Sequence, residues 1–396
     1  MLAGSGARFA ARRAHVSTLG FAQESTPGFA PLSMPALELP LLTELDDLLT
    51  HQTLETHDRV FIEDPRWTER FIIEVHDPGG RLLLFTGLGI YPNTGYMDGF
   101  AIVSSGGQQR NLRVGRNLEP HRWRLQAGPL SFQILDPMRS WLLSCDEGEH
   151  GFSFQIELTR RTKPYQMPTM RIERDGQLLV AYSHFVQAGR YSGFVEVEGQ
   201  RFDCEGWTGE RDRSWGVRPP SARTRRGMHT WLPIQWDDVS IWVWTRDDAA
   251  GRQSGLCGAI RPVNDGGGEP AEPVPVSAYE HDLDIELVGE HRLLRGGHLR
   301  ISGQDGSVYE IEVERTGPHL SLYGGGYGGE HAQGTPKGEL FIASDRWGTD
   351  PESFAKVPHS ILEHSCRFTR ADGRVGYGCF ELCFGEYAPK GLGPVS

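Results

Sequence analysis

Ten residues near the middle of the chain, 209–218, combine carboxylates, arginines and a tryptophan between two glycines. The run reads Gly-Glu-Arg-Asp-Arg-Ser-Trp-Gly-Val-Arg. In a β-strand, successive side chains alternate between faces, so Glu210 and Asp212 share one face. Two carboxylates on one face repel each other when both are ionised, which raises the pKa of at least one. The run therefore predicts a general acid, with Asp212 as proton donor and Glu210 as the neighbour that raises its pKa. The opposite face of the strand carries Arg211, Arg213 and Trp215.

The same run also permits a purely structural interpretation. Arginines and carboxylates can form ion pairs that pin two sheets together, and an arginine folded over the strand edge would cancel the pKa rise. In either interpretation the arginines position the strand: Arg211, Arg213 and Arg218. The residues alone leave both interpretations open.

Aromatic side chains are dense just after this run. Four tryptophans follow within 231–244, where Trp242 and Trp244 share a strand face and Trp231 shares one with His229. Tryptophans around a cavity suit a flat apolar ligand and stabilise a developing cation by their ring faces. The alternative is an ordinary barrel core, in which His229 is a hydrogen-bonded core residue.

Other motifs give no sign of a cofactor. The glycine run 324–329 lacks the Lys-Ser/Thr ending of a phosphate loop and is interpreted as a turn or bulge. His359 and His364 have no third ligand nearby in the sequence, and no Gly-x-Ser-x-Gly motif is present. The sequence predicts no metal site, no nucleotide site and no nucleophilic hydrolysis.

Composition restricts the class of protein. The net charge of −12 among 396 residues argues against nucleic acid and anionic membrane surfaces as partners. Six cysteines without a Cys-x-x-Cys pair favour a reducing, cytoplasmic location. No apolar stretch approaches the roughly 18 residues of a membrane helix. Arg8, Arg12 and Arg13 invite a transit-peptide interpretation, but a loose N-terminal extension is preferred.

Fifty glycines and 25 prolines leave few helical periodicities and favour many short strands. The best helix candidate is 37–53 within an extension over 1–54. Two strand series follow, which predict one antiparallel barrel over 55–220 and a second over 221–396. Residues 152–158 alternate cleanly between apolar and polar side chains, as a half-buried barrel strand does.

The segment 211–216 resembles the Arg-Asp-x-Ser-Trp-Gly signature of the carotenoid 1,2-hydratase (AttH-like) family. The resemblance implies an all-β fold of two consecutive lipocalin-like antiparallel β-barrels, here with a short N-terminal helical extension. Known members include isoprenoid hydratases and cyclases that shape a polyketide-type substrate. The hydratases carry Tyr where Glu210 stands, and an upstream His-x-Trp where this chain has His184-Phe185-Val186.

The residues and the resemblance together predict a cofactor-independent lyase or isomerase of hydratase or dehydratase type. Its substrate would be a small, apolar, unsaturated and isoprenoid-like molecule. Asp212 would be the general acid, supported by Glu210, and His184 enters through the family pattern. Residues expected to bind the substrate are Tyr182, Trp215, His229, Trp231 and Trp244. Two alternatives remain: a cyclase that folds its substrate without acid catalysis, or a non-catalytic lipid or isoprenoid carrier.

Overall fold

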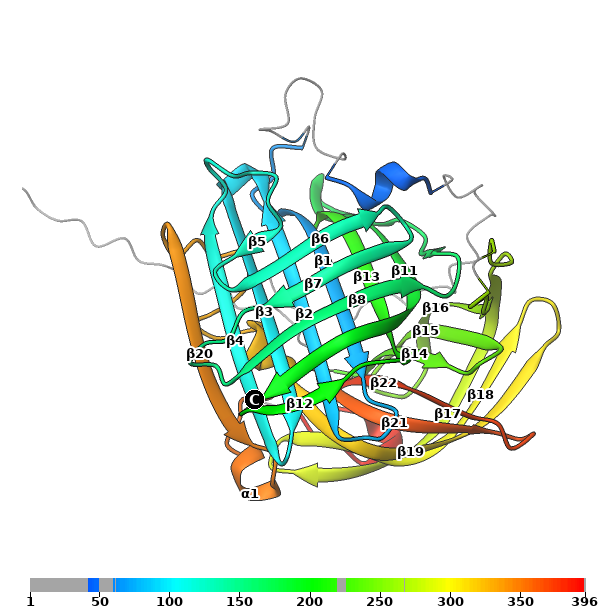
Figure 1. Ribbon diagram of the computed structural model, residues 1–396. Coiled ribbons are helices and arrows are strands. Elements are labelled where there is room, and N and C mark those ends of the chain that lie inside the picture. The colour runs from blue at the N-terminus through cyan, green and yellow to red at the C-terminus, as the bar shows by residue number, and fades with distance from the viewer. Residues whose placement is uncertain (1–41, 50–59, 61, 219–225, 267, 395–396) are drawn as a thin grey trace, which may run out of the picture. The chain divides into compact units, whose positions relative to one another are not determined.

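The computed structural model describes residues 42–49, 60, 62–218, 226–266 and 268–394. Strands dominate these residues (Figure 1). The helices are short. They are the 3-10 helices η1 (Glu44–Asp47), η2 (Pro92–Thr94), η3 (Leu322–Gly325) and η4 (Ala388–Lys390), and the α-helix α1 (Pro351–Phe354).

The first sheet has 14 antiparallel strands, and its main path runs β20-β4-β3-β2-β1-β13-β11-β8-β7-β6-β5. The sheet curls on itself, so that β5 at one end of the path contacts β3 and β4, which lie near the opposite end. Its strands are β1 (Trp67–His76), β2 (Leu82–Tyr91), β3 (Tyr96–Ser105), β4 (Gln108–Asn117), β5 (Gln126–Ala127), β6 (Leu130–Asp136), β7 (Ser140–Cys145), β8 (Phe152–Arg160), β9 (Tyr165–Gln166), β10 (Met170–Arg174), β11 (Gln177–Val197), β12 (Gln200–Asp203), β13 (Trp207–Val217) and β20 (Leu340–Gly348).

The second sheet is a closed antiparallel barrel of consecutive strands, interrupted only where β20 leaves to pair with β4 of the first sheet (Figure 1). The predicted all-β fold of two consecutive barrels is therefore confirmed. The barrel strands are β14 (Met228–Gln235), β15 (Val239–Asp247), β16 (Gln253–Pro262), β17 (Val274–Val288), β18 (His291–Gly303), β19 (Val308–Ser321), β21 (Leu362–Arg370) and β22 (Val375–Phe384).

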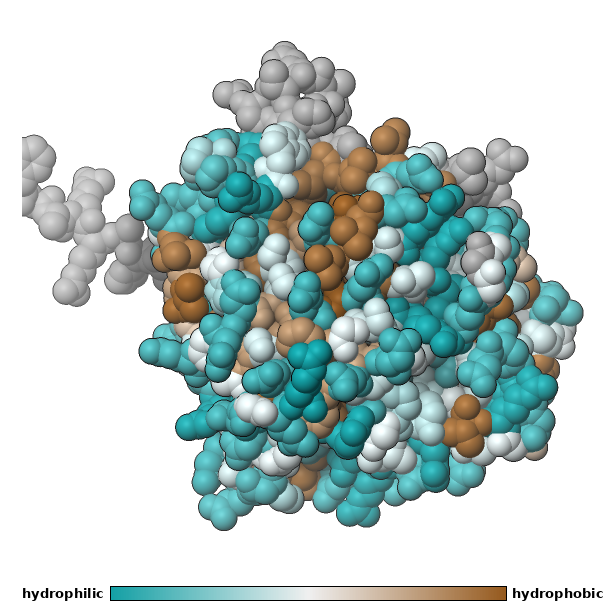
Figure 2. Space-filling view, viewed as in Figure 1, coloured by the Kyte–Doolittle hydropathy of each residue, from teal (hydrophilic) through white to brown (hydrophobic). Residues whose placement is uncertain are grey.

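The predicted helix over 37–53 is reduced, in the part that the structure describes, to η1, and the rest of it lies outside the described residues. The alternation expected for 152–158 is confirmed, since β8 buries Phe152, Phe154, Ile156 and Leu158. Each sheet encloses its own hydrophobic core. The outer face seen in Figure 2 is mostly hydrophilic, as a sheet with one buried face requires. In the part of the chain that the structure describes, no helix is long and apolar enough to cross a membrane.

A buried histidine in the second barrel predicts sensitivity to acid. His364 Nδ1 lies 2.9 Å from the Phe380 carbonyl oxygen, and the Leu294 N–H donates to His364 Nε2 at 3.2 Å. This pattern fits a neutral ring, and burial lowers the pKa of His364 from 6.5 to about 3. Below pH 6.5 the unfolded state therefore binds a proton that the folded state does not. Stability should fall as the pH drops, by about 2 kcal/mol between pH 7 and 5 from this group.

Urea unfolding of the wild type and of His364→Gln at pH 7 and 5 measures this contribution. The variant should lose less stability between the two pH values, whereas the exposed His121→Gln should match the wild type. Equal pH dependence in all three proteins would contradict the assignment.

Candidate functional site

Strand β13 carries the run 209–218 through the first sheet, paired with β1 on one side and β11 on the other. The expected alternation of its side chains is confirmed by their contacts. Arg211 and Arg213 bind partners on one face of the sheet, and Glu210 meets the second barrel on the other. The strand therefore divides its charged residues into two sets with different surroundings.

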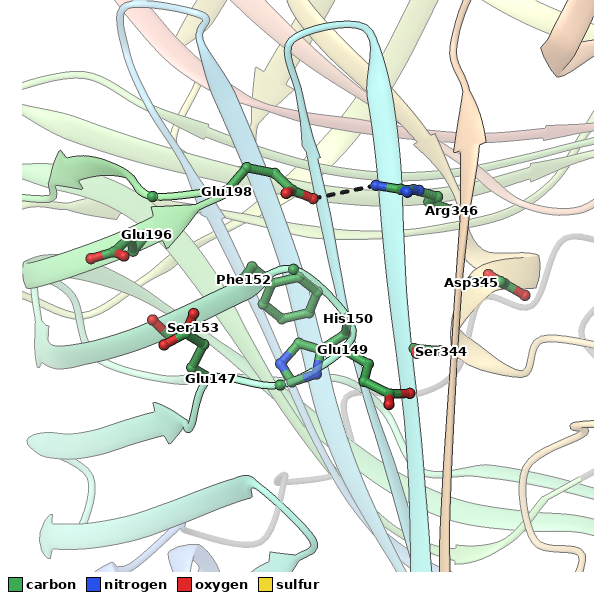
Figure 3. A pocket seen from close by; sticks show the side chains of 13 residues that line it. Glu147, Glu149, His150, Phe152, Ser153, Glu196, Glu198, Ser344, Asp345 and Arg346 are labelled. Atoms are coloured by element: carbon green, nitrogen blue, oxygen red, sulfur yellow. Dashed lines mark hydrogen bonds and ion pairs between the residues drawn. The ribbon is translucent and has the colours of Figure 1, made fainter.

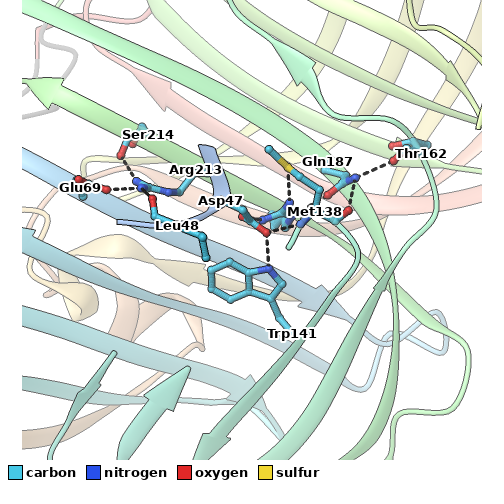
Figure 4. Close-up of polar contacts among 10 residues, drawn as sticks. Asp47, Leu48, Glu69, Met138, Trp141, Thr162, Gln187, Arg213 and Ser214 are labelled. Atoms are coloured by element: carbon cyan, nitrogen blue, oxygen red, sulfur yellow. Dashed lines mark hydrogen bonds and ion pairs between the residues drawn. The ribbon is translucent and has the colours of Figure 1, made fainter. Parts of the chain in front are cut away.

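Arg211 and Arg213 form buried ion pairs, and Figure 4 shows Arg213 beside Glu69. Arg211 Nη1 lies 2.5 Å from Oδ1 of Asp47, which comes from η1 and also accepts a hydrogen bond from Trp141 Nε1 at 3.0 Å. Arg213 pairs with Glu69 of β1. These charged side chains are at most 2% exposed, so a small substrate does not reach them without rearrangement. The structural interpretation of the run holds for both arginines.

Glu210 is fixed in a third buried pair, which joins the two sheets. Its carboxylate accepts hydrogen bonds from Arg261 Nη1 at 2.6 Å and Nη2 at 2.9 Å, and Arg261 also donates to Ser240 Oγ at 2.8 Å. Both charged side chains have no exposed surface. Burial raises the pKa of Glu210 above its ordinary value, although Arg261 opposes the shift.

Asp212 has a different kind of partner. Its Oδ1 lies 2.8 Å from Nε2 of His184 on β11, and these two side chains are 16% and 8% exposed. The other ring nitrogen of His184 contacts Sδ of Met167. Burial alone would raise the pKa of Asp212, but His184, Arg218 and Arg70 together hold it below the ordinary value.

The expectation that Glu210 raises the pKa of Asp212 is therefore wrong. Arg261 binds the Glu210 carboxylate, so the repulsion inferred from the strand alternation does not decide the pKa of Asp212. Positive groups from neighbouring strands outweigh burial and favour an ionised carboxylate.

Arg70 and Tyr327 complete the surroundings of Asp212, and the sequence interpretation missed both. Arg70 and His184 lie opposite Ser214, on β1 and β11 respectively, so they flank Asp212 from its two sides. The guanidinium of Arg70 lies 5.8 Å from the centre of the Tyr327 ring. Burial raises the pKa of Tyr327 to about 12, with contributions from nearby Glu381 and Asp212. Tyr327 is therefore close to charged groups of both sheets.

The glycine run 324–329 begins within η3 and continues as the expected turn from Gly326, and its glycines explain how Tyr327 reaches this place. A Cβ on Gly325 would lie 2.7 Å from the Phe100 ring of β3, and a Cβ on Gly324 would overlap the Asn111 side chain of β4. Only residues without a side chain permit this close approach to the first sheet. A signal in the sequence was thus present: a single tyrosine within a run of glycines.

A cluster of aromatic residues borders His184. The Trp242 ring centre lies 6.1 Å from that of His184, and Trp231 and Tyr165 pack on Trp242 at the same separation. The indole Nε1 atoms of Trp231 and Trp242 are buried without a hydrogen-bond partner among the described residues. Buried indole N–H groups usually have a partner, so these two donors mark this cluster as a place where a polar atom of a ligand or water would be stabilised.

His229 lies at the other end of the same tryptophans. Its ring centre is 6.1 Å from that of Trp244, which packs against the cluster of Trp231 and Trp242. Its Nε2 lies 2.8 Å from Oε1 of Glu381 on β22. The structure thus places His229, Trp231 and Trp244 near the cluster that His184 borders, and adds Trp242 to them.

The remaining expected site residues lie apart from this cluster. Trp215 packs with Trp67, Val217 and their neighbours in a separate hydrophobic group. The guanidinium of Arg218 lies over the ring of Tyr182, 4.4 Å from its centre. Arg218 still influences the pKa of Asp212, so Tyr182 borders the site through this arginine.

A separate cavity of about 520 Å³ carries five carboxylates and one arginine among its 13 lining residues (Figure 3). It lies between the loop that precedes β8, the β11–β12 turn and β20, and it contains neither Asp212, His184 nor any residue of the aromatic cluster. Arg346 and Glu198 form an ion pair across it at 3.5 Å. Its acidic lining does not suit an apolar substrate. Nor do the described residues contain a group of three His, Cys, Asp or Glu side chains placed to hold a metal ion.

Comparisons with known proteins identify the fold. The model of a family of unknown function (DUF8625) matches residues 42–393. A candidate AttH from Nitrosomonas europaea shares 12% identity at a TM-score of 0.52, over 82% of this chain and 94% of that chain. Such a likeness shows the shared fold alone. No curated protein matches the chain.

Two further solved structures have lower scores. Kievitone hydratase from Nectria haematococca has a TM-score of 0.44 and 13% identity, over 88% of this chain and 94% of that chain. CghA with Sch210972 has a TM-score of 0.48 and 8% identity, over 81% of this chain and 89% of that chain. These scores are too low for either name to decide the function of this chain.

Proposed function

We propose that this chain, which belongs to the DUF8625 family of unknown function, is an enzyme of hydratase or dehydratase type. The observation that carries the proposal is the pair of the partly exposed Asp212 with the buried His184 beside the aromatic cluster. The other charged residues considered in β13 are locked in buried arginine–carboxylate pairs. Of the two carboxylates in β13, Asp212 is partly exposed and contacts a histidine, whereas Glu210 is fully buried against an arginine.

The proposed role of Asp212 is that of a base in the resting enzyme. Because the pKa of Asp212 is lowered, the carboxylate is ionised at neutral pH and accepts a proton from water or from a substrate carbon. His184 orients the carboxylate through its 2.8 Å contact. In the reverse direction the same carboxyl returns the proton. This differs from the acid role expected from the sequence, because the electrostatic surroundings of Asp212 differ from those expected.

The substrate class follows from the cluster of Trp231, Trp242 and Tyr165. Aromatic faces bind flat, apolar, unsaturated molecules and stabilise positive charge that develops on carbon. An isoprenoid-like alkene or allylic alcohol has both properties. Proton transfer and aromatic stabilisation need no cofactor, so the proposed reaction is cofactor-independent.

Isotope incorporation tests this function. The enzyme is incubated with acyclic isoprenoid alcohols and polyenes, such as farnesol and squalene, in D₂O or in H₂¹⁸O, and the products are analysed by mass spectrometry. Hydration should add deuterium to carbon and ¹⁸O to the new hydroxyl group, and His184→Gln should suppress both. Tight binding without isotope incorporation would instead indicate a carrier. A rearranged product without solvent deuterium on carbon would indicate a cyclase that only folds its substrate.

A further inference from the structure

A second group of titratable side chains lies on the second barrel, where β21 and β22 pair. Glu363 and Glu381 stand directly opposite each other in the register of these strands, and Glu381 helps to raise the pKa of Glu363. Cys379 Sγ lies 3.1 Å from Oε2 of Glu363. Glu381 in turn lies 2.8 Å from His229 Nε2. The four residues therefore lie in one row, from Cys379 through the two facing carboxyl groups to His229.

The row runs from the interior to a partly exposed end. Glu363 has no exposed surface, Glu381 is about one-tenth exposed, and the side chain of His229 is 21% exposed. Two carboxyl groups that face each other across paired strands in a buried place cannot both be ionised, so they share a proton. Burial raises the pKa of Glu363 well above its ordinary value, and Glu381 and the nearby Glu74 of β1 add to the shift. Glu363 therefore carries the shared proton, and Glu381 is the carboxyl group that contacts His229.

This group adjoins the Asp212–His184 pair. Tyr327 is close enough to both Glu381 and Asp212 for each to raise its pKa. His184 contacts Trp242, and His229 contacts Trp244, within one aromatic cluster. The two histidines thus approach the cluster from opposite sheets.

We propose that His229 is a second catalytic residue, the acid that complements Asp212, and that Glu381 and the protonated Glu363 position it. The inference rests on the proposed function, since adding water to an unactivated double bond requires an acid as well as a base. With Nε2 held by Glu381, the Nδ1 edge of the ring meets the substrate.

The Nδ1–H bond of the His229 imidazolium breaks as its proton forms a C–H bond with the alkene π electrons, which leaves a carbocation at the adjacent carbon. The tryptophan faces stabilise this cation. Water forms the C–O bond, and its proton passes to the Asp212 carboxylate. The reaction adds one water molecule in total. His229 then takes up one proton from solvent, and Asp212 releases one.

Binding of N,N-dimethylfarnesylamine, whose ammonium group mimics the cation, tests this arrangement. The Hε1 signals of His184 and His229 are followed by NMR in ¹³C-histidine protein and are assigned with His184→Gln and His229→Gln. Both signals should shift along one binding curve, while exposed His121 should not. A shift of His184 without His229 would overturn the inference and leave the proposed function intact. A shift of neither, or no binding, would contradict the proposed function itself.

Infrared spectroscopy tests the shared proton independently of any ligand. The wild type should show the C=O stretch of a buried protonated carboxyl group at neutral pH, and Glu363→Gln should remove it. The exposed Glu312→Gln is the matched control and should retain the band. If the Glu363→Gln spectrum equals that of the wild type, Glu363 does not hold the proton.

Discussion

Asp212→Asn is expected to lower the turnover number for hydration of an isoprenoid substrate by about 10²- to 10⁴-fold, the usual contribution of a positioned acid or base. The amide keeps the shape of the side chain but cannot accept a proton. The melting temperature should fall only modestly: the amide loses the attraction to the positive groups that lower the pKa of Asp212, but Arg70 still contacts Tyr91 and Tyr327. The measurement is turnover per folded molecule together with the thermal midpoint.

Three variants separate this catalytic role from a structural one. Asp248→Asn is the matched control, since Asp248 is paired with the exposed Arg252 in a turn, and it should leave turnover unchanged. Arg213→Ala and Trp215→Ala should lower the melting temperature, because they remove a buried partner or leave a cavity. A large fall in melting temperature for Asp212→Asn, with full activity in the folded fraction, would make Asp212 a structural residue.

Arg261→Met is expected to lower the free energy of unfolding by about 3–5 kcal/mol at pH 7, because it leaves the Glu210 carboxylate buried without its partner. Glu210 already has a raised pKa through burial, and the loss of Arg261 would raise it further. The destabilisation should therefore be present at neutral pH and decrease as the pH falls and Glu210 takes up a proton. Urea unfolding at pH 7 and 5 measures both effects.

Two comparisons make this prediction specific. Arg252→Met removes an exposed partner of Asp248 and should cost at most about 1 kcal/mol. The double variant Glu210→Leu/Arg261→Met removes both buried charges and should recover most of the stability lost in the single variant. A double variant as unstable as Arg261→Met would show that lost packing, rather than the unpaired carboxylate, causes the destabilisation.

Local rules explain what could be predicted about β13 and the strands. Side-chain alternation has a period of two residues, so the division of Glu210 and Asp212 from Arg211 and Arg213 follows from the order of residues. Frequent glycine and proline between short apolar runs likewise predict many strands. The helix predicted over 37–53 is longer than the one observed in the described part of that segment, η1. This short helix places Asp47 in its ion pair with Arg211.

The amino-acid sequence by itself determined the all-β class, the two consecutive barrels and Asp212 as a candidate site residue, because these depend on local patterns. Only the tertiary structure decided which charges meet. Glu210 is neutralised by Arg261, 51 positions away, and Asp212 is flanked by His184 and Arg70 from two other strands. Glu381 and Tyr327 are both more than 100 positions after Asp212 in the sequence, yet Tyr327 lies close enough to Asp212 and Glu381 for both to raise its pKa. Coulomb interactions depend on distance in space and on burial, so strand alternation could place the carboxylates on a face but could not set their pKa values.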